Sequence, residues 1–182
     1  LGEAIMSMRE ALQGLLPGRL DVRVPDESKP VLVEIGHDRL EYLLLHLVAN
    51  ARDAMPSNGR VDISLEVVTG ELLPAEQLEK NPRKRMARIA VSDSGGGMNL
   101  DVQAQMFEPF FSTKETHAGL GLTLVYGIVR QSGGTVEVQS QPGQGTTVRV
   151  YLPLVERHAV LRDTRVLPEA LSKGAETVLL VE

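Results

Sequence analysis

Apolar residues recur at two different spacings along this chain, and the spacing predicts which segments are helices and which are strands. A repeat of three to four residues is typical of helices, whereas strict alternation with polar residues is typical of strands that bury one face. The helical spacing covers residues 2–16, 38–55 and 120–131, and a short helix is expected over 99–107. Alternation covers residues 20–24, 31–35, 60–68, 87–91, 135–138 and 146–152.

The remaining stretches predict how the chain is divided. Residues 69–85 are polar and contain the basic run 83–85, so they are interpreted as a surface insertion with a solvated tip. From residue 155 to 173 the composition is charged and typical of a linker. Residues 177–182 form a continuous apolar run, as in strands buried on both faces. Because the chain begins at Leu1 and ends inside that run, we expect it to be part of something longer.

Composition limits the classes of function. The 182 residues fit one domain, and 42% hydrophobic residues with only three Phe, three Tyr and no Trp predict a mainly aliphatic core. A net charge of −5 argues against a nucleic-acid or anionic-membrane surface. The absence of cysteine excludes disulfides and thiolate metal sites.

Polar residues form a row along one face of the helix predicted over 38–55. His46, Asn50 and Asp53 are spaced at i, i+4 and i+7, so they lie beside the aliphatic stripe of the same helix. An amide and a carboxylate there could hold a hard cation such as Mg²⁺ through oxygen. A solvated helix face is the alternative, and the row alone leaves it open.

A carboxylate follows the strand predicted over 87–91 and precedes three glycines. Asp93 could accept a hydrogen bond from an exocyclic amine such as that of adenine, and the glycines at 95–97 allow a ligand to approach the backbone. A plain tight turn is the alternative. The spacing matches neither a dinucleotide-binding turn nor a P-loop, because Leu100 stands where the former needs glycine and no GxxxxGK[ST] occurs.

Residues 106–122 combine aromatic rings, a lysine and a glycine pair. Backbone N–H groups at 119–122 (GLGL) lie at the start of the predicted helix over 120–131, where the helix dipole favours phosphate oxygens. Glycines that only serve packing are the alternative. Phe110, Phe111 and Lys114 predict a hinged flap with Lys114 available to phosphate, although the rings could equally fill the core.

Four of these segments together resemble the catalytic and ATP-binding domain of sensor histidine kinases, within the GHKL ATPase superfamily. Residues 46–55 (HLVANARDAM) resemble its N box, 93–98 (DSGGGM) its first glycine box, 107–114 (FEPFFSTK) its F box and 119–122 its second glycine box. The resemblance covers roughly residues 38–153. It implies an α/β fold, a two-layer sandwich of a mixed β-sheet and helices (the Bergerat fold), with ATP between the N-box helix and a lid.

The resemblance also implies roles for individual residues. Asn50 would coordinate Mg²⁺, with His46 a further candidate ligand, and Asp53 would order water or a partner side chain. Asp93 would bind the adenine amine, and Thr146 would support the base from the last strand. No catalytic residue is certain, and Lys114 is a candidate. The remaining predicted cofactor contacts belong to the two glycine boxes: Gly95, Gly97, Met98, Gly119, Leu120, Gly121 and Leu122.

Three departures from the family's pattern are visible. His46 stands where histidine kinases usually have Asn and ATP-hydrolysing relatives have a Glu base. The lid between Lys114 and Gly119 is short. The helical hairpin that carries the phosphate-accepting histidine is missing.

The expected organisation follows from that absence. Residues 1–19 would be the linker helix from the missing dimerisation hairpin, 20–156 the ATP-binding domain, 157–175 a linker and 176–182 the start of a truncated receiver domain of a hybrid kinase. The expected function is that of a cytoplasmic, ATP-binding catalytic module, monomeric in isolation, whose partners are the phosphoacceptor hairpin and the receiver. An ATP-hydrolysing clamp and a non-catalytic nucleotide sensor are the alternatives.

Overall fold

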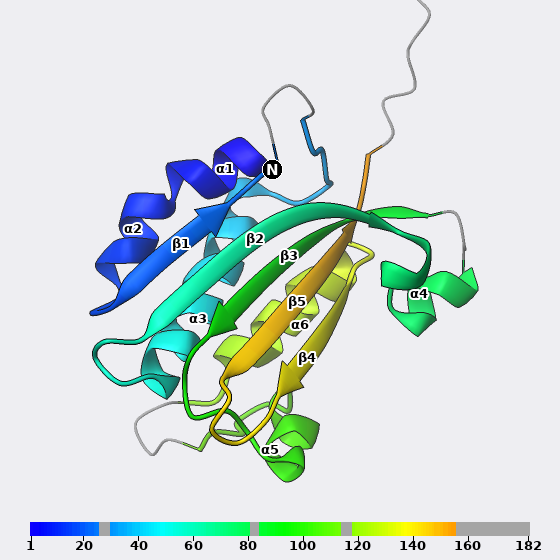
Figure 1. Ribbon diagram of the computed structural model, residues 1–182. Coiled ribbons are helices and arrows are strands. Elements are labelled where there is room, and N and C mark those ends of the chain that lie inside the picture. Colours follow the sequence, from blue (N-terminus) through cyan, green and yellow to red (C-terminus); the bar gives the residue numbers. More distant parts are fainter. Residues whose placement is uncertain (26–29, 81–83, 114–117, 156–182) are drawn as a thin grey trace, which may run out of the picture.

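The computed structural model describes residues 1–25, 30–80, 84–113 and 118–155. Five strands form one mixed sheet in the order β1-β2-β3-β5-β4, in which β1 runs parallel to β2 and every other pair is antiparallel (Figure 1). The strands are β1 (Arg19–Arg23), β2 (Arg60–Thr69), β3 (Arg85–Asp93), β4 (Thr135–Ser140) and β5 (Thr146–Pro153). The predicted two-layer α/β sandwich is confirmed.

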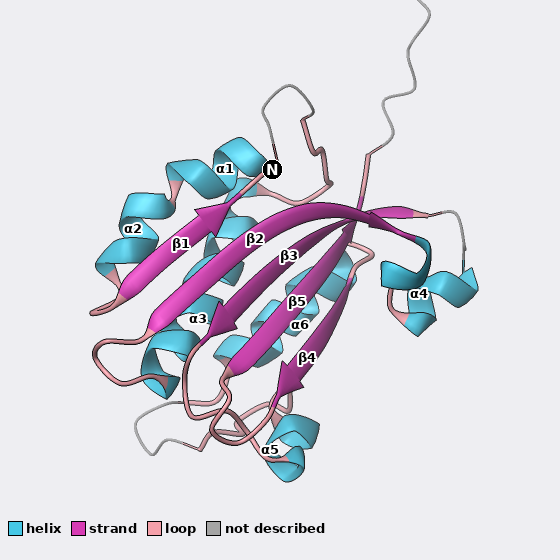
Figure 2. Ribbon diagram, in the orientation of Figure 1, coloured by secondary structure: helices cyan, strands magenta, loops and turns pink. Residues whose placement is uncertain are grey.

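Two long helices, α3 (His37–Ala54) and α6 (Gly121–Gln131), cover one face of the sheet (Figure 2). The buried stripe of α3 includes Leu40, Leu44 and Leu47, the helical positions that the sequence places toward the core. They pack in a single aliphatic core with inward residues of the strands, such as Ile63 and Ile89. Neither helix, nor any other in the described residues, is long and apolar enough to cross a membrane.

The register of the three strands β3, β5 and β4 brings three polar residues into one row at the end of the sheet. Asp93 is opposite Thr146, and Thr146 is opposite Ser140. Asp93, Thr146 and Ser140 each lie two residues from an apolar residue of the same strand that points into the core, namely Val91, Val148 and Val138, respectively. Side chains two residues apart share a face of the sheet, so all three polar residues face the helix layer. The next row, Ser92 and Thr147, therefore faces the opposite side of the sheet.

The helix predicted over residues 2–16 is interrupted at Met8, where φ is −86° and ψ is −7°. Two helices result, α1 (Gly2–Ser7) and α2 (Arg9–Gly14). Ile5 and Leu12 are fully buried and belong to the main core. These helices therefore pack as part of the same domain, and their continuation into a hairpin stays a prediction.

The alternating segment 31–35 is not the strand that the pattern predicts. Only Val33 forms a β-bridge, with Leu154, and the N–H of Val155 donates to the carbonyl of Leu32 at 2.9 Å. β5 is already paired on both sides by β3 and β4, so only the residues at its end offer a free edge to this segment.

The segment predicted as a polar surface insertion contains the short helices η1 (Gly70–Leu72) and α4 (Ala75–Lys80). Leu73 packs with Val68, Met86 and Tyr151 in a second small core. Those three strand residues face away from α3 and α6, so the insertion covers one end of the outer sheet face. The carboxylate of Glu76 on α4 also pairs with Arg130 of α6 at 2.9 Å.

Some predictions fall outside the described residues. These are the linker at 157–175, the start of a receiver domain at 176–182 and the placement of Lys114. They stay predictions.

Candidate functional site

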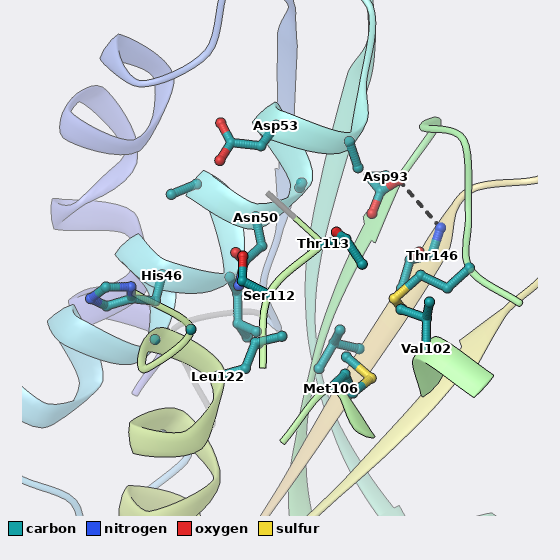
Figure 3. A pocket seen from close by; sticks show the side chains of 18 of the residues that line it. His46, Asn50, Asp53, Asp93, Val102, Met106, Ser112, Thr113, Leu122 and Thr146 are labelled. Atoms are coloured by element: carbon teal, nitrogen blue, oxygen red, sulfur yellow. Dashed lines mark hydrogen bonds between the residues drawn. The ribbon is translucent and has the colours of Figure 1, made fainter. Parts of the chain in front are cut away.

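A cavity of about 830 Å³ lies between α3, the start of α6 and the ends of β3 and β5. Its volume is in the range of small-molecule sites, which is about 300–1,000 Å³. Figure 3 shows Asp93 and Thr146 on one side of it and Asn50 and Leu122 on the other. Most of the predicted site residues line the cavity: His46, Asn50, Asp53, Asp93, Gly97, Met98, Gly119, Leu120, Gly121, Leu122 and Thr146.

Asp93 is the last residue of β3, and two backbone groups hold its carboxylate. The N–H groups of Gly95 and Thr146 donate to the same oxygen, Oδ1, at 2.8 and 3.3 Å. Within the described residues this leaves Oδ2 for another donor. Burial raises the pKa of Asp93 above its ordinary value of 3.8, and the two N–H donors lower it in part. An oriented, partly desolvated carboxylate of this kind suits a ligand that brings its own N–H.

Two of the three glycines after Asp93, Gly95 and Gly97, are required by close packing of the backbone, whereas a Cβ on Gly96 would have open space. Gly97 has φ of +66°, and a Cβ there would overlap the carbonyl oxygen of Gln141. Gly95 does not line the cavity as predicted. A Cβ at this position would lie 2.5 Å from the carbonyl oxygen of Ala54, so Gly95 serves the approach of this loop to the end of α3. Gly96 takes its place in the cavity wall.

Asn50 lies about one turn before the end of α3, with its amide toward the cavity (Figure 3). Among the described residues its Nδ2 is buried and has no hydrogen-bond partner, an arrangement that costs stability unless a ligand or water supplies one. One turn further on, Asp53 is held by Arg52, whose Nε donates to Oδ1 at 2.9 Å.

These residues fit a magnesium ion that is held mainly by phosphate oxygens. No group of three or more His, Asp or Glu side chains within the described residues could cage a metal. Mg²⁺ commonly takes only one or two protein ligands together with substrate phosphates, and an amide such as that of Asn50 suits this role.

His46 lies against the start of α6. Its ring contacts Tyr42 with centroids 4.1 Å apart, and a Cβ on Gly121 would be 2.8 Å from its Nδ1. Figure 3 shows the imidazole turned away from Asn50, so the two side chains diverge. Burial lowers the pKa of His46 from its ordinary value of 6.5, which favours the neutral form of the ring. Its predicted metal role stays a prediction.

The three Phe residues have three different surroundings. Phe107 packs on Tyr126 of α6 with ring centroids 5.2 Å apart, and Phe111 lines the cavity. Phe110 is 76% exposed and has φ of +68°, the left-handed region that a bulky residue rarely adopts. Its N–H donates to the carbonyl of Gly119 at 3.2 Å, so the described residues before position 114 and after position 117 are hydrogen-bonded to each other.

Several cavity residues were missed by sequence reasoning. Val102 and Met106 come from the region of α5 (Leu100–Gln105) and form an apolar part of the cavity wall, on the side below Asp93 and Thr146 in Figure 3. Behind that wall, the Nε2 of Gln103 donates to the carbonyls of Met98 and Ser140 at 3.0 and 3.1 Å. The helical spacing of 99–107 was visible, but the side of the helix that faces a ligand was not.

A profile of the family described as "Histidine kinase-, DNA gyrase B-, and HSP90-like ATPase" matches residues 36–156. The chain belongs to this ATPase family. Sensor kinase CckA of Brucella abortus (strain 2308) is 31% identical over 194 residues, which is all of this chain and 20% of that protein. Sensor histidine kinase ZraS of Klebsiella oxytoca is 34% identical over 130 residues, covering 70% of this chain and 25% of that protein.

Solved structures of this ATPase family's histidine kinases share the fold. A mycobacterial sensor histidine kinase, MprB, matches 84% of this chain and 94% of its own with a TM-score of 0.66 at 24% identity. The full-length ShkA in complex with AMPPNP matches with a TM-score of 0.60 at 26% identity, covering 84% of this chain and 29% of that one. The chain is therefore a histidine kinase type of ATPase domain, and it spans a fifth to a quarter of the length of the curated relatives named above.

Proposed function

We propose that the cavity binds Mg·ATP and that the chain is the catalytic module of a two-component sensor histidine kinase. The observation that carries the proposal is Asp93, whose Oδ1 accepts from two backbone donors. The same cavity contains the Nδ2 of Asn50, which has no hydrogen-bond partner among the described residues. The adenine amine would donate to Oδ2. The phosphates would accept from the backbone at the start of α6 and from Nδ2 of Asn50.

The reaction would move the γ-phosphoryl group to a histidine on a separate helical hairpin. The bond between phosphorus and the β,γ-bridging oxygen breaks, a bond to an imidazole nitrogen forms, and ADP leaves with the electron pair. A bound Mg²⁺ would neutralise charge on the phosphate oxygens. The residues of this chain orient the nucleotide and exclude water, which is the main protein contribution to phosphoryl transfer.

The relatives support this assignment at the level of the whole protein. They are named sensor kinases, and the chain corresponds to a small part of each, so further domains of a parent would supply the acceptor hairpin and a receiver. Mg²⁺ as the cofactor, a cytoplasmic site of action and a monomeric state in isolation belong to the same proposal. Light scattering tests the last, and a dimer would contradict it.

Transfer in trans tests the proposed function. The chain is incubated with radiolabelled ATP and the helical hairpin domain of the parent protein, and label is expected on the hairpin histidine. The Asp93→Asn variant should transfer little, whereas Ser92→Ala, a change on the opposite sheet face, should transfer normally. Bound ATP without transfer at any protein concentration would refute kinase activity and leave a nucleotide sensor.

A second candidate is an ATP-hydrolysing clamp, which needs a base near the γ-phosphate. His46 lines the cavity at the position where such relatives have a glutamate base, and an imidazole there in place of a carboxylate argues against this candidate. The close approach of its Nδ1 to Gly121 argues instead for a packing role. Steady ATP hydrolysis that disappears in His46→Ala would support the clamp.

A further inference from the structure

Ser140, on β4 behind the cavity, has a hydroxyl that is fully committed to three neighbours. Its Oγ accepts from the N–H of Met98 at 2.8 Å, donates to the carbonyl of Gly145 at 3.1 Å and lies 2.9 Å from the Oγ1 of Thr146. Ser140 itself does not line the cavity, whereas Thr146 and Met98 do. Any influence on a ligand must therefore pass through those two residues.

Counting protons favours one direction for the hydrogen bond between the two hydroxyls, in which either oxygen could by distance be the donor. A serine hydroxyl has one proton and can accept twice. The amide of Met98 can only donate, and the carbonyl of Gly145 can only accept. If Ser140 gives its proton to that carbonyl, every partner is satisfied only when Thr146 donates to Ser140. The Thr146 hydroxyl can then only accept a hydrogen bond from a ligand in the cavity, because its proton is already used.

This arrangement determines the hydrogen-bonding character of the cavity beside Asp93. Thr146 is opposite Asp93 in the sheet and also donates its backbone N–H to the Asp93 carboxylate. With its hydroxyl proton turned toward Ser140, both side chains offer only acceptors. An acceptor pair favours a base with an exocyclic amine and disfavours one with a carbonyl at the same place, because buried acceptors facing one another are left unsatisfied.

We infer that Ser140 is a specificity-determining positioning residue, which sets the Thr146 hydroxyl as an acceptor and so makes the site select amino purines over oxo purines. The inference rests on the proposed function, since it concerns the same nucleotide cavity. Ser140 acts without touching the nucleotide. Loss of its hydroxyl would free the Thr146 proton to point into the cavity and donate to a carbonyl.

The test is a calorimetric titration of the whole chain with ATP and with ITP, which carries a carbonyl where ATP has the amine. For the unmodified chain we expect preference for ATP. In Ser140→Ala the preference for ATP over ITP, measured as the ratio of the two dissociation constants, should fall by about tenfold, because roughly one hydrogen bond distinguishes the two bases. The matched control is Ser92→Ala. The hydroxyl oxygens of Ser92 and Thr147 also form a serine–threonine hydrogen bond, 2.9 Å long, but on the opposite face of the sheet. That variant should keep the original ratio.

A second pair of variants covers the case in which Ser140→Ala does not fold. Thr146→Ser keeps a hydroxyl and should keep the preference for ATP over ITP. Thr146→Val removes the hydroxyl and should lower that preference. Where Ser140→Ala does fold, adding it to Thr146→Val should change the ratio no further. Equal weakening of ATP and ITP in Ser140→Ala would overturn the inference and leave the proposed function intact. Absence of ATP binding to the unmodified chain would overturn both.

Discussion

Replacing Gly121 with alanine would place a methyl group against the imidazole of His46. The added Cβ would lie 2.8 Å from Nδ1, inside the 3.4 Å at which ordinary van der Waals contact begins. The ring also contacts Tyr42, with centroids 4.1 Å apart, and this contact limits how far it can move. Either the imidazole leaves its position or the start of α6 moves, and α6 begins at Gly121, one of the two glycines assigned to phosphate.

The magnitude follows from two opposing terms. Alanine in a helix is favoured over glycine by about 0.5–1 kcal/mol. Against this, an off-rotamer imidazole costs about 0.5–1.5 kcal/mol, and a weakened ring contact costs a similar amount. We therefore expect Gly121→Ala to lower the unfolding free energy by about 0–2.5 kcal/mol in the natural background. In the His46→Ala background the clash is absent, so the same change should raise it by about 0.5–1 kcal/mol.

Urea unfolding of the four proteins in this double-mutant cycle measures the coupling directly. The two substitutions should be non-additive by about 1–3 kcal/mol, and ATP affinity lost in Gly121→Ala should return in the double variant. Additivity within about 0.5 kcal/mol would refute the close packing of His46 on α6.

Three further changes probe separate features. Leu12→Ala should lower the unfolding free energy by about 2–5 kcal/mol in urea titrations, because the side chain is fully buried; a near-neutral effect would show that α2 is not part of the core. Asn50→Leu should raise the unfolding free energy by about 1–3 kcal/mol, because it removes a buried donor that has no partner among the described residues. It should also abolish any Mg²⁺ dependence of ATP binding. Equal Mg²⁺ dependence in both proteins would contradict the assignment of Asn50 to the Mg²⁺ site. Burial raises the pKa of Asp93, so the folded chain binds that proton more readily than the unfolded one, and the unfolding free energy should fall as pH rises from 3.8 through the raised value. Asp93→Asn should lose this part of the pH dependence, and an identical pH profile would show that the carboxyl is not desolvated.

Much of the fold was predictable because its main elements have unambiguous patterns. The stripe of Leu40, Leu44 and Leu47 defines α3, and the alternation of Val61, Ile63 and Leu65 defines β2. Asp93 was predictable as a site residue because it follows such a strand directly and precedes glycines. Local spacing alone carries these conclusions.

Features that depend on distant partners were not predictable. Residues 31–35 alternate like a strand, but they become one only if a free sheet edge is present, and the end of β5 offers little. The insertion looked polar, yet Leu73 finds apolar partners on the outer sheet face. Ser140 carries no motif; its importance comes from the register that places it opposite Thr146.

The most direct test of the nucleotide site is a calorimetric titration of ATP, with and without Mg²⁺, into the chain and into Asp93→Asn. The amide introduced by this substitution would keep an oxygen for the N–H groups of Gly95 and Thr146, so the variant should remain folded while presenting its own donors to the adenine amine. We predict Mg²⁺-dependent binding to the natural chain and a loss of at least about tenfold in the variant, the cost of one unsatisfied buried hydrogen bond. Equal affinity in the two folded proteins, or no binding to the natural chain, would contradict the assignment of this cavity to ATP.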